Sequence, residues 1–428
     1  MNPTYVLSKI PGFTNIISTK KDTENEDCCN DDEQLKYFNV TEYSTKSNEV
    51  YKIVRYRKEM LALDLIPSYG LLRSVVINSQ NRVVSFAPPK SLPADQFMTK
   101  FVKSNYIIAQ EFVEGTMINV FFDESIHSWK LATRNTVDAN VSFYRSNKTD
   151  QGTSNKTFNT MFVEACQANN LNLDTLNKQY CYSFVLQHPD NRIVVPFTSP
   201  RLYLVEVFEI IQTETTIEVI SQNISAVRTN GAWNLSSIRF PEVYEFTTYS
   251  ELIEKFASAN TPYDIMGIVI KNMITNERTK IRNPIYEEVR HLKGNQSKIQ
   301  YQYLHLRKEG KIPEFLKFYP ENKKEFSECR NQVHMFTNML HQNYLACYVR
   351  KERPLGEYGQ QFRTHMFKIH EQYINDLKPR GLFVTNTVVI NYVNNLAPAL
   401  LMHSLNYHLR KQKVDIIKAD VSVDLEQH

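Results

Sequence analysis

The sequence predicts an α+β protein in which an antiparallel-sheet domain precedes a mainly helical C-terminal domain. Up to residue 283, short runs rich in Val, Ile, Tyr and Phe alternate with turn residues, a pattern typical of strands and hairpins. After Pro284 the apolar period changes from two residues to about 3.6, which indicates helices. We therefore expect an N-terminal extension over 1–47, a sheet domain over 48–283 and a helical domain over 284–428.

Composition supports a soluble globular protein. The chain has 428 residues, 42% of them hydrophobic and 22% charged, with a formal net charge of +4 that excludes no functional class. We find neither a run of about 18 apolar residues nor a basic-then-apolar start, so we expect a cytoplasmic protein with no membrane partner. The Asn, Lys, Ile and Tyr content would suit an AT-rich genome, such as a viral one.

The cysteines predict no metal site. The six of them are scattered without Cys-x-x-Cys or Cys/His ligand spacing, so we expect no zinc. Cys28 and Cys29 adjoin within the polar, acidic stretch 23–34. That stretch predicts a solvated loop, and the pair is better explained as a reduced dithiol than as a structural bridge.

One stretch of three predicted strands surrounds an acidic residue and a glycine. Residues 106–113 are β-rich, and 117–122 with 128–133 predict a hairpin whose turn lies in between. Glu114-Gly115 separates the first strand from the hairpin. Because the chain has only 11 glycines, one placed here predicts a close backbone approach or an unusual φ. By itself, the step fits a β-bulge equally well.

The remaining elements follow from the same signals. Upstream, residues 71–78 and 82–86 predict a hairpin, and 156–169 an amphipathic helix. Later strands are expected over 202–211 and 217–220, with a helix over 250–258. In the last third we expect helices over 321–350, 358–377 and 383–410, a break at 379–381 and a kink at Pro398.

The order of these motifs resembles the ATP-grasp-like nucleotidyltransferase domain of bacteriophage-type ATP-dependent RNA ligases, over about residues 50–283. The resemblance implies further strands over 182–185, 191–194, 266–271 and 278–282. That family carries a Lys-x-Asp-Gly-Ser/Thr step whose lysine attacks the α-phosphate of ATP. The aligned residues here run from Phe112 through Glu114 and Gly115 to Thr116. Phenylalanine has no lone pair, so a lysyl-adenylate cannot form at position 112.

The resemblance also implies a nucleotide site on the sheet domain. Its expected residues are Arg73, Lys90, Glu114, Gly115, Arg134, Lys280 and Arg282. Lys280 and Arg282 stand two apart on one strand, so they would point to the same face and could hold a triphosphate. The family's glycine after the arginine is Ser74 here. Each cation alone would also fit an ordinary surface residue.

Two acidic residues of the family pattern are replaced. The strand Tyr182–Val185 matches an aromatic-Glu-Phe-Val motif with Ser183 in place of the glutamate, and Met266 stands where a second glutamate precedes Gly267. With Phe112, these losses leave no catalytic residue to assign. The resemblance implies ATP as a ligand, but without the two carboxylates tight Mg²⁺ binding is not expected.

A basic run after the sheet domain predicts RNA contact. Its cations are interleaved with two tyrosines, a mixture that suits a phosphate backbone with stackable bases. A solvated charged face is the equally weighted alternative. The residues are Arg290, Lys293, Lys298, Tyr301, Tyr303, Arg307, Lys308 and Lys311.

Three functions stay open from the sequence. The first is an RNA-ligase-like pseudoenzyme that binds nucleotide or RNA ends. The second is an active ligase with a relocated nucleophile, for which Lys90, Lys271 and Lys280 are candidates. The third is a protein-interaction scaffold built on the ligase fold. The selective loss of the chemical residues, with the cations retained, favours the first slightly over the third.

Overall fold

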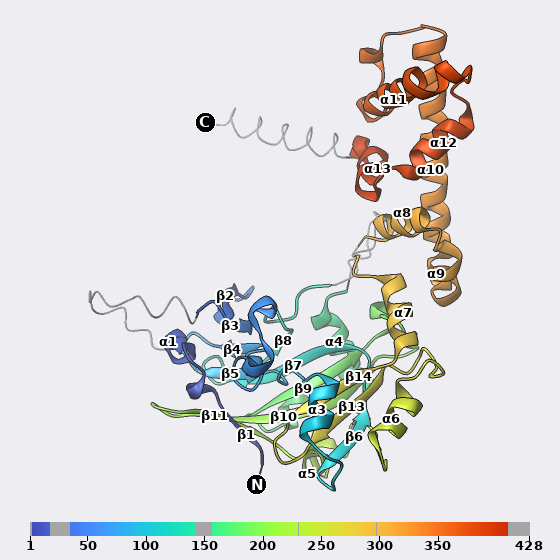
Figure 1. The fold of residues 1–428 in the computed structure, drawn as a ribbon. Helices are drawn as coiled ribbons and strands as arrows, with labels where there is room; N and C mark the ends of the chain where they lie inside the picture. Colours follow the sequence, from blue (N-terminus) through green and yellow to red (C-terminus); the bar gives the residue numbers. More distant parts are fainter. Residues whose placement is uncertain (1, 18–34, 143–155, 230, 297, 410–428) are drawn as a thin grey trace, which may run out of the picture. The chain divides into compact units, whose positions relative to one another are not determined.

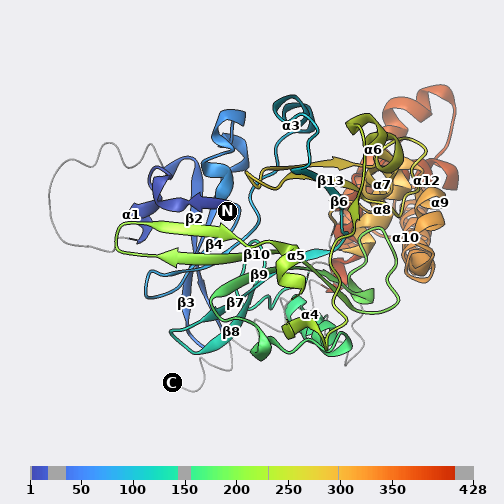
Figure 2. The same cartoon turned by 90° about the horizontal axis from the view of Figure 1, so that it is seen from below.

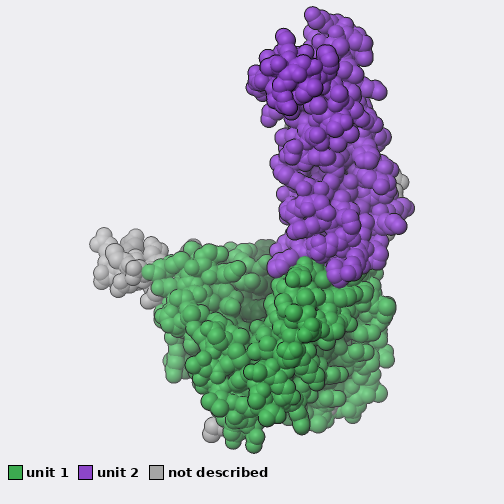
Figure 3. All heavy atoms as spheres, turned by 45° about the vertical axis from the view of Figure 1, so that its right-hand side comes forward, with its two compact units in different colours: residues 1–143, 154–290 green, residues 144–153, 291–428 purple. Residues whose placement is uncertain are grey.

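The computed structural model describes residues 2–17, 35–142, 156–229, 231–296 and 298–409. The acidic stretch 23–34 and its Cys28-Cys29 pair therefore lie outside the described residues. Figure 3 colours the two compact units of the chain: unit 1 comprises 1–143 with 154–290, and unit 2 comprises 144–153 with 291–428. Within the described ranges, no helix is long and apolar enough to cross a membrane.

Unit 1 is built on three sheets, and all pairings between its named strands are antiparallel (Figures 1 and 2). The first sheet runs β1 (Thr4–Val6), β11 (Ile217–Ser221), β10 (Arg201–Gln212), β9 (Tyr180–Gln187), β7 (Thr116–Asp123) and β8 (Ser128–Ala132). The second runs β12 (Val243–Tyr244), β6 (Ile107–Glu111), β13 (Gly267–Asn272) and β14 (Arg278–Arg282). The third runs β2 (Phe38–Ser44), β3 (Val50–Tyr56), β4 (Val75–Ile77) and β5 (Val83–Phe86).

Short helices complete unit 1. They are α1 (Phe13–Ile17), α3 (Ala94–Lys100), α4 (Phe158–Ala168), α5 (Ile224–Arg228) and α6 (Tyr249–Phe256). The predicted amphipathic helix is α4: its N-cap Thr157 accepts a hydrogen bond from the amide of Thr160, and its apolar side enters a core with Phe184 and Leu204. Helix α7 (Pro284–Lys293) follows β14.

The second sheet has one apolar face and one polar face. Ile268 and Ile270 of β13 share a buried core with Phe97 of α3 and with Leu252 and Phe256 of α6. These two helices therefore cover one side of the sheet. Because side chains alternate along a strand, the neighbours of Ile268 and Ile270 in β13, and the residues opposite them, face the other side. That other face carries the candidate site.

The two glycines that border this face have the geometry only glycine accepts readily. Gly115 has φ of +148°, and a Cβ there would lie 2.5 Å from the carbonyl oxygen of Leu186. Gly267 has φ of +131°, and a Cβ there would meet the carbonyl oxygen of Ile281. The predicted close approach at Glu114-Gly115 is therefore confirmed, and it results from the pairing of β7 with β9.

One strand expected from the sequence does not form. Residues 191–194 were expected to pair as a strand, but the chain makes a 3-10 turn over Pro189–Asn191 and then runs without strand structure. The reason is a side chain: the carboxylate of Glu114 accepts the amide hydrogens of Val194 and Val195, at 2.9 and 3.1 Å. Those amides bind a loop residue and are unavailable to a ladder.

Unit 2 is helical throughout its described part. Its helices are α8 (Ile299–Glu309), α9 (Ile312–Phe318), α10 (Lys323–Tyr344), α11 (Gln360–Gln372), α12 (Asn386–Asn395) and α13 (Pro398–Leu405). Single π-helical turns extend α10 and α11 over Leu345–Val349 and Tyr373–Leu377. The expected kink at Pro398 is wrong, because this proline is the first residue of α13, where its missing N–H has no intrahelical partner to lose.

The fold class predicted from the sequence is thus confirmed: antiparallel sheets with helices, followed by a mainly helical C-terminal region. Unit 2 has its own buried contacts. His365 of α11 bonds Tyr392 Oη through Nδ1 at 2.9 Å and Ser404 Oγ through Nε2 at 2.8 Å. Burial, followed by the charge of Lys368, lowers the pKa of His365 to about 4, so the ring is neutral at pH 7.

Candidate functional site

The site begins on β14, where three cations share one face. Arg278, Lys280 and Arg282 alternate along the strand, opposite Lys271, Val269 and Gly267 of β13. On the far side of β13, Val269 pairs with Gln110 of β6. This face is the one left uncovered by α3 and α6, so the three cations project from the polar side of the second sheet.

Two further cations reach the same place from the third sheet. Arg73 lies two residues before the start of β4, and Lys90 lies in the segment between β5 and α3. That segment is fastened to β14, since the amide of Leu92 donates to the carbonyl of Arg278 at 2.9 Å, and Nη2 of Arg278 donates to the carbonyl of Pro89 at 2.9 Å. We call Arg73, Lys90, Arg278, Lys280 and Arg282 the cation cluster.

Phe112 supplies the floor of the cation cluster. Nζ of Lys280 lies 4.9 Å from the centroid of the Phe112 ring, and Cζ of Arg282 lies 5.4 Å from it. Both distances are within the range of a cation–π interaction. Phe112 is therefore an aromatic ring in contact with two cations, and it offers them an electron-rich face rather than another positive charge.

Part of the positive charge of the cation cluster is not neutralised by ion pairs among the described residues. The charged groups that act on Lys280 are Arg278, Arg73, Arg282 and Lys90, and burial together with these charges holds the pKa of Lys280 well below its usual range. Burial first, then Arg278, lowers the pKa of Arg73 to about 10. Among the described residues, no carboxylate forms an ion pair with Arg73, Lys90 or Lys280. Such a site attracts an anion.

A neighbouring lysine on the same face is neutralised. Nζ of Lys271 lies 2.8 and 3.0 Å from the two carboxylate oxygens of Glu206 on β10, and both side chains are buried. Arg278 Nη1 is 3.8 Å from the same carboxylate. Lys271 was one of the three candidate relocated nucleophiles, and its ammonium is already held by a carboxylate. It is therefore the least suited of the three to attack a phosphate.

Ser183 and Met266 are the two residues that the sequence resemblance aligns with glutamates. Ser183 is fully buried, and its Oγ donates to Asn119 Oδ1 across β7 and β9 at 2.8 Å. Met266 contributes its carbonyl, which accepts the amide of Asn283 at 3.1 Å. Across the part of the chain that the structure describes, no group of three or more His, Cys, Asp or Glu residues could hold a metal ion.

The other residues expected in the nucleotide site have different surroundings. Glu114 is 5% exposed, and its carboxylate is occupied by the 194–195 amides. Arg134 is exposed, its guanidinium lies 5.5 Å from the Tyr56 ring centroid, and its charge still reaches Arg73. Arg282 also pairs with Glu287, with an N–O distance of 2.6 Å. Arg278 was not among the site residues expected from the sequence. Its spacing of two residues from Lys280 on one strand is the signal that could have placed it on the same face.

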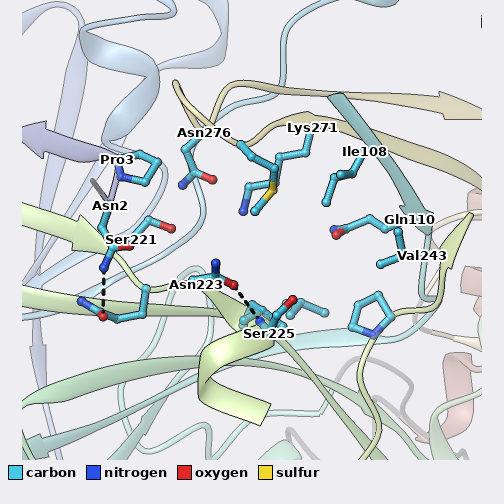
Figure 4. Close-up of a pocket in the computed structure, with 15 residues that line it drawn as sticks. Asn2, Pro3, Ile108, Gln110, Ser221, Asn223, Ser225, Val243, Lys271 and Asn276 are labelled. Atoms are coloured by element: carbon cyan, nitrogen blue, oxygen red, sulfur yellow. Dashed lines mark hydrogen bonds between the residues drawn. The ribbon is translucent and has the colours of Figure 1, made fainter. Parts of the chain in front are cut away.

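A cavity of about 170 Å³ lies beside the Lys271–Glu206 pair in unit 1. Figure 4 shows Gln110, Lys271 and Asn276 around it, together with the apolar side chains of Ile108 and Val243. None of the residues of the cation cluster, and not Phe112, belongs to its lining. The cavity and the cation cluster are therefore separate features of the face that β6, β13 and β14 share.

The cations of the basic run of residues 290–311 have different partners. In unit 1, Arg290 pairs with Glu287 at 3.2 Å. In unit 2, Lys311 pairs with Glu309 at 3.1 Å, Lys293 Nζ lies 5.1 Å from the Tyr319 ring, and Arg307 donates to Asn394 Oδ1. Lys298 and Lys308 are exposed cations of this run.

The two tyrosines of the basic run differ. Tyr301 is partly exposed, whereas Tyr303 is 3% exposed and packs edge-on against Phe326 with 5.3 Å between ring centroids. A ring buried in a helical core has no free face for a base, so the expectation that Tyr303 stacks on RNA is corrected. Helical spacing in α8 explains the difference, since positions two apart face different sides.

Sequence comparison finds relatives among viral proteins, and no family model matches. An RNA ligase of Rhodothermus phage RM378 is 25% identical over 288 residues, covering 61% of this chain and 64% of that protein. This chain is similar to an RNA ligase. The immediate-early protein ICP-46 homolog of Invertebrate iridescent virus 6 is 27% identical over 285 residues, 62% of this chain and 58% of that protein. The match thus spans less than two thirds of either relative.

Solved structures resemble the chain at low scores. Two forms of an archaeal ATP-dependent RNA ligase have TM-scores of 0.34 and 0.36 at 9% and 8% identity, over 86% of this chain and 73% and 74% of theirs. A Naegleria gruberi RNA ligase with PPi has a TM-score of 0.30 at 11% identity, over 59% of this chain and 98% of that one. At these values the likeness carries no residue-level correspondence.

Proposed function

We propose that this chain is an RNA-ligase-like protein that binds a nucleotide or the phosphorylated end of an RNA without making a covalent adduct at position 112. The observation that supports it is the cation cluster: cations from three separate segments act on one another, two of them lie over the Phe112 ring, and Arg73, Lys90 and Lys280 have no carboxylate partner among the described residues. Phosphate oxygens would supply the missing counter-charge.

In this role the side chains would bind phosphate through their charge and their position, without reacting with it. Lys280 and Arg73 would contact phosphate oxygens from the strand and from the β4 approach, and Lys90 would contact them from the exposed rim. Phe112 would hold Lys280 and Arg282 in place without offering a nucleophile. Gly115 and Gly267 would allow the close backbone approach on either side of this ring, because a Cβ at either position would collide with a backbone carbonyl oxygen.

A first experiment separates binding from covalent chemistry. The full chain is incubated with ATP labelled on the α-phosphate and with Mg²⁺, then denatured and resolved by size. We expect no labelled band at 50.1 kDa, because a phenylalanine cannot form a phosphoramidate. In parallel, fluorescence anisotropy of a 5′-phosphorylated RNA at low salt should show binding. Absence of any binding to ATP or RNA would overturn the proposal in favour of the protein-interaction scaffold.

The position of Lys280 supports a second candidate, an active ligase with a relocated nucleophile. Its Nζ lies against the ring that takes the place of the family's lysine, and burial and neighbouring cations lower its pKa, which enlarges the neutral, nucleophilic fraction. In this candidate, Nζ would bond the α-phosphorus of ATP and pyrophosphate would leave. A labelled band that is present in the wild type and lost in Lys280→Met, but kept in Lys90→Met, would establish it.

A further inference from the structure

We propose that the cation cluster recognises a chain of phosphates directly, with its own side chains as the counter-charge, and that it does so without a divalent metal ion. This inference rests on the proposed function, and it identifies the phosphate chain as the part of the ligand that the site binds. The ligand class is a linear polyphosphate, whether it ends a nucleotide, ends an RNA or is free.

The charges around the cation cluster disfavour a divalent cation. Lys280 is surrounded by Arg278, Arg73, Arg282 and Lys90, and a metal ion entering there would meet repulsion from every one of them. A polyphosphate experiences the opposite: Arg73, Lys90 and Lys280 would each gain a partner that no described carboxylate provides. Charge-assisted hydrogen bonds to phosphate are the stronger class of hydrogen bond, and arginine forms them in pairs.

The acids near the cation cluster are already engaged. Glu206 is held by Lys271 at 2.8 Å, and Glu287 binds both Arg282 and Arg290, at 2.6 and 3.2 Å. The Glu114 carboxylate accepts two backbone amides. A metal ligand recruited from these three would have to abandon its partner, and in the case of Glu206 would leave a buried ammonium unpaired, which is strongly unfavourable.

The Phe112 ring suits a site that binds an anion. It lies under Lys280 and Arg282 at cation–π distances, so it favours their charged forms without adding a charge of its own. A carboxylate at that place would neutralise the two cations, and a lysine would repel them. An aromatic ring is the side chain that keeps both cations ordered and still available to an anion.

Calorimetric titration of the full chain tests this inference with inorganic tripolyphosphate, ATP and a 5′-triphosphorylated RNA, each in EDTA and in excess Mg²⁺. We expect all three to bind in EDTA, and Mg²⁺ to weaken binding severalfold because it neutralises part of the phosphate charge. Lys280→Met should weaken binding about tenfold or more. The control is Lys255→Met, which removes another lysine that contacts a phenylalanine, with Nζ 5.2 Å from the Phe256 ring centroid.

The outcomes are distinguishable. Binding of ATP that requires Mg²⁺ would overturn the metal-independent inference and leave the proposed function standing. Binding of ATP in EDTA without binding of tripolyphosphate would overturn it as well, because the nucleoside, rather than the phosphate chain, would then be read. Absence of binding in both buffers would overturn the proposed function itself. Circular dichroism of each variant establishes that it is folded.

Discussion

The cation cluster and the basic run of residues 290–311 contain similar residues and differ in what surrounds them. In the run, Arg290 and Lys311 pair with nearby glutamates and Arg307 binds an asparagine. In the cation cluster, Lys280 is half-buried, and the largest charge effects on it come from other cations of the cluster. A basic stretch that is local in sequence can form ion pairs with acids of the same stretch. In the cation cluster, the nearby Glu206 and Glu287 pair with Arg278 and Arg282, and Arg73, Lys90 and Lys280 have no carboxylate partner among the described residues.

The largest effect expected is a loss of stability. It should be large for the alanine variant of one tyrosine of the basic run and small for that of the other. Tyr303→Ala removes a ring that is 3% exposed and should cost unit 2 about 3 kcal/mol or more. Tyr301→Ala is the matched control and should cost less than about 1 kcal/mol. Urea unfolding followed by far-ultraviolet circular dichroism measures the helices. Both tryptophans, Trp129 and Trp233, lie in unit 1, so their fluorescence reports that unit separately.

If Tyr301 contacts RNA, its alanine variant should also bind RNA more weakly with an unchanged salt slope, because a stacked ring displaces no counterion. Equal destabilisation by Tyr301→Ala and Tyr303→Ala would contradict the assignment of one ring to the core and the other to the surface.

The second effect is on RNA affinity and compares cations in the two regions. The double change Lys280→Ala, Arg282→Ala should weaken binding of a 5′-phosphorylated RNA by more than about tenfold and flatten the log–log salt slope by roughly one to two, at about 0.7 per phosphate contact. The matched double change Lys298→Ala, Lys308→Ala removes two exposed cations of the basic run. We expect it to change affinity by less. Anisotropy titrations from low to moderate salt give both quantities, and a larger loss in the second variant would reverse the comparison.

The third effect is a pH dependence of the stability of unit 2. It arises because His365 is buried in its neutral form, in contrast to the charged side chains of the cation cluster. The pKa of His365 is about 4 in the folded chain, against a usual value of 6.5. Its contribution to stability is therefore complete above about pH 6.5 and is lost as pH falls toward 4, by up to roughly 3 kcal/mol. The helical unfolding transition should weaken over this window in the wild type. A pH dependence unchanged in His365→Gln would contradict the assignment.

The smallest effect expected is that of Phe112→Lys. Restoring a lysine places a further positive charge against Lys280 and Arg282, so we expect a loss of roughly 1 kcal/mol of stability. If the proposed alignment of Ser183 and Met266 with two glutamates holds, RNA joining should not appear, because such residues act as a unit. A joining assay on nicked and single-stranded RNA measures it. Efficient joining by this variant would show that those two losses are tolerated.

Local signals predicted much of the fold. The hairpin of β7 and β8, helix α4 and the helical last third all follow from period and turn residues that lie within one window of sequence. The strand expected at 191–194 was wrong because Glu114, some eighty positions earlier in the chain, takes its amides. Nothing in the residues around 191–194 shows whether their amides will bind a neighbouring strand or a distant carboxylate.

The candidate site was predicted as a set of residues but not as an arrangement. Lys280 and Arg282 follow from alternation on one strand. That Lys271 is neutralised by Glu206, and that Lys280 is not neutralised, depends on how β10 packs against β13, which no local pattern specifies. Likewise, the period in α8 indicates a buried stripe, but which of its tyrosines lies in that stripe depends on where the ring of Phe326 packs.

The depressed pKa of Lys280 also makes this side chain a chemical handle. At neutral pH a larger share of its amine is unprotonated than on an ordinary surface lysine, so it should react sooner with carbonyl reagents. Pyridoxal 5′-phosphate combines such a carbonyl with a phosphate that the surrounding guanidinium groups would attract. Borohydride reduction of the resulting imine, followed by peptide mapping, would tag Lys280 selectively, and protection from tagging would then report occupancy of the site by any competing anion, labelled or not.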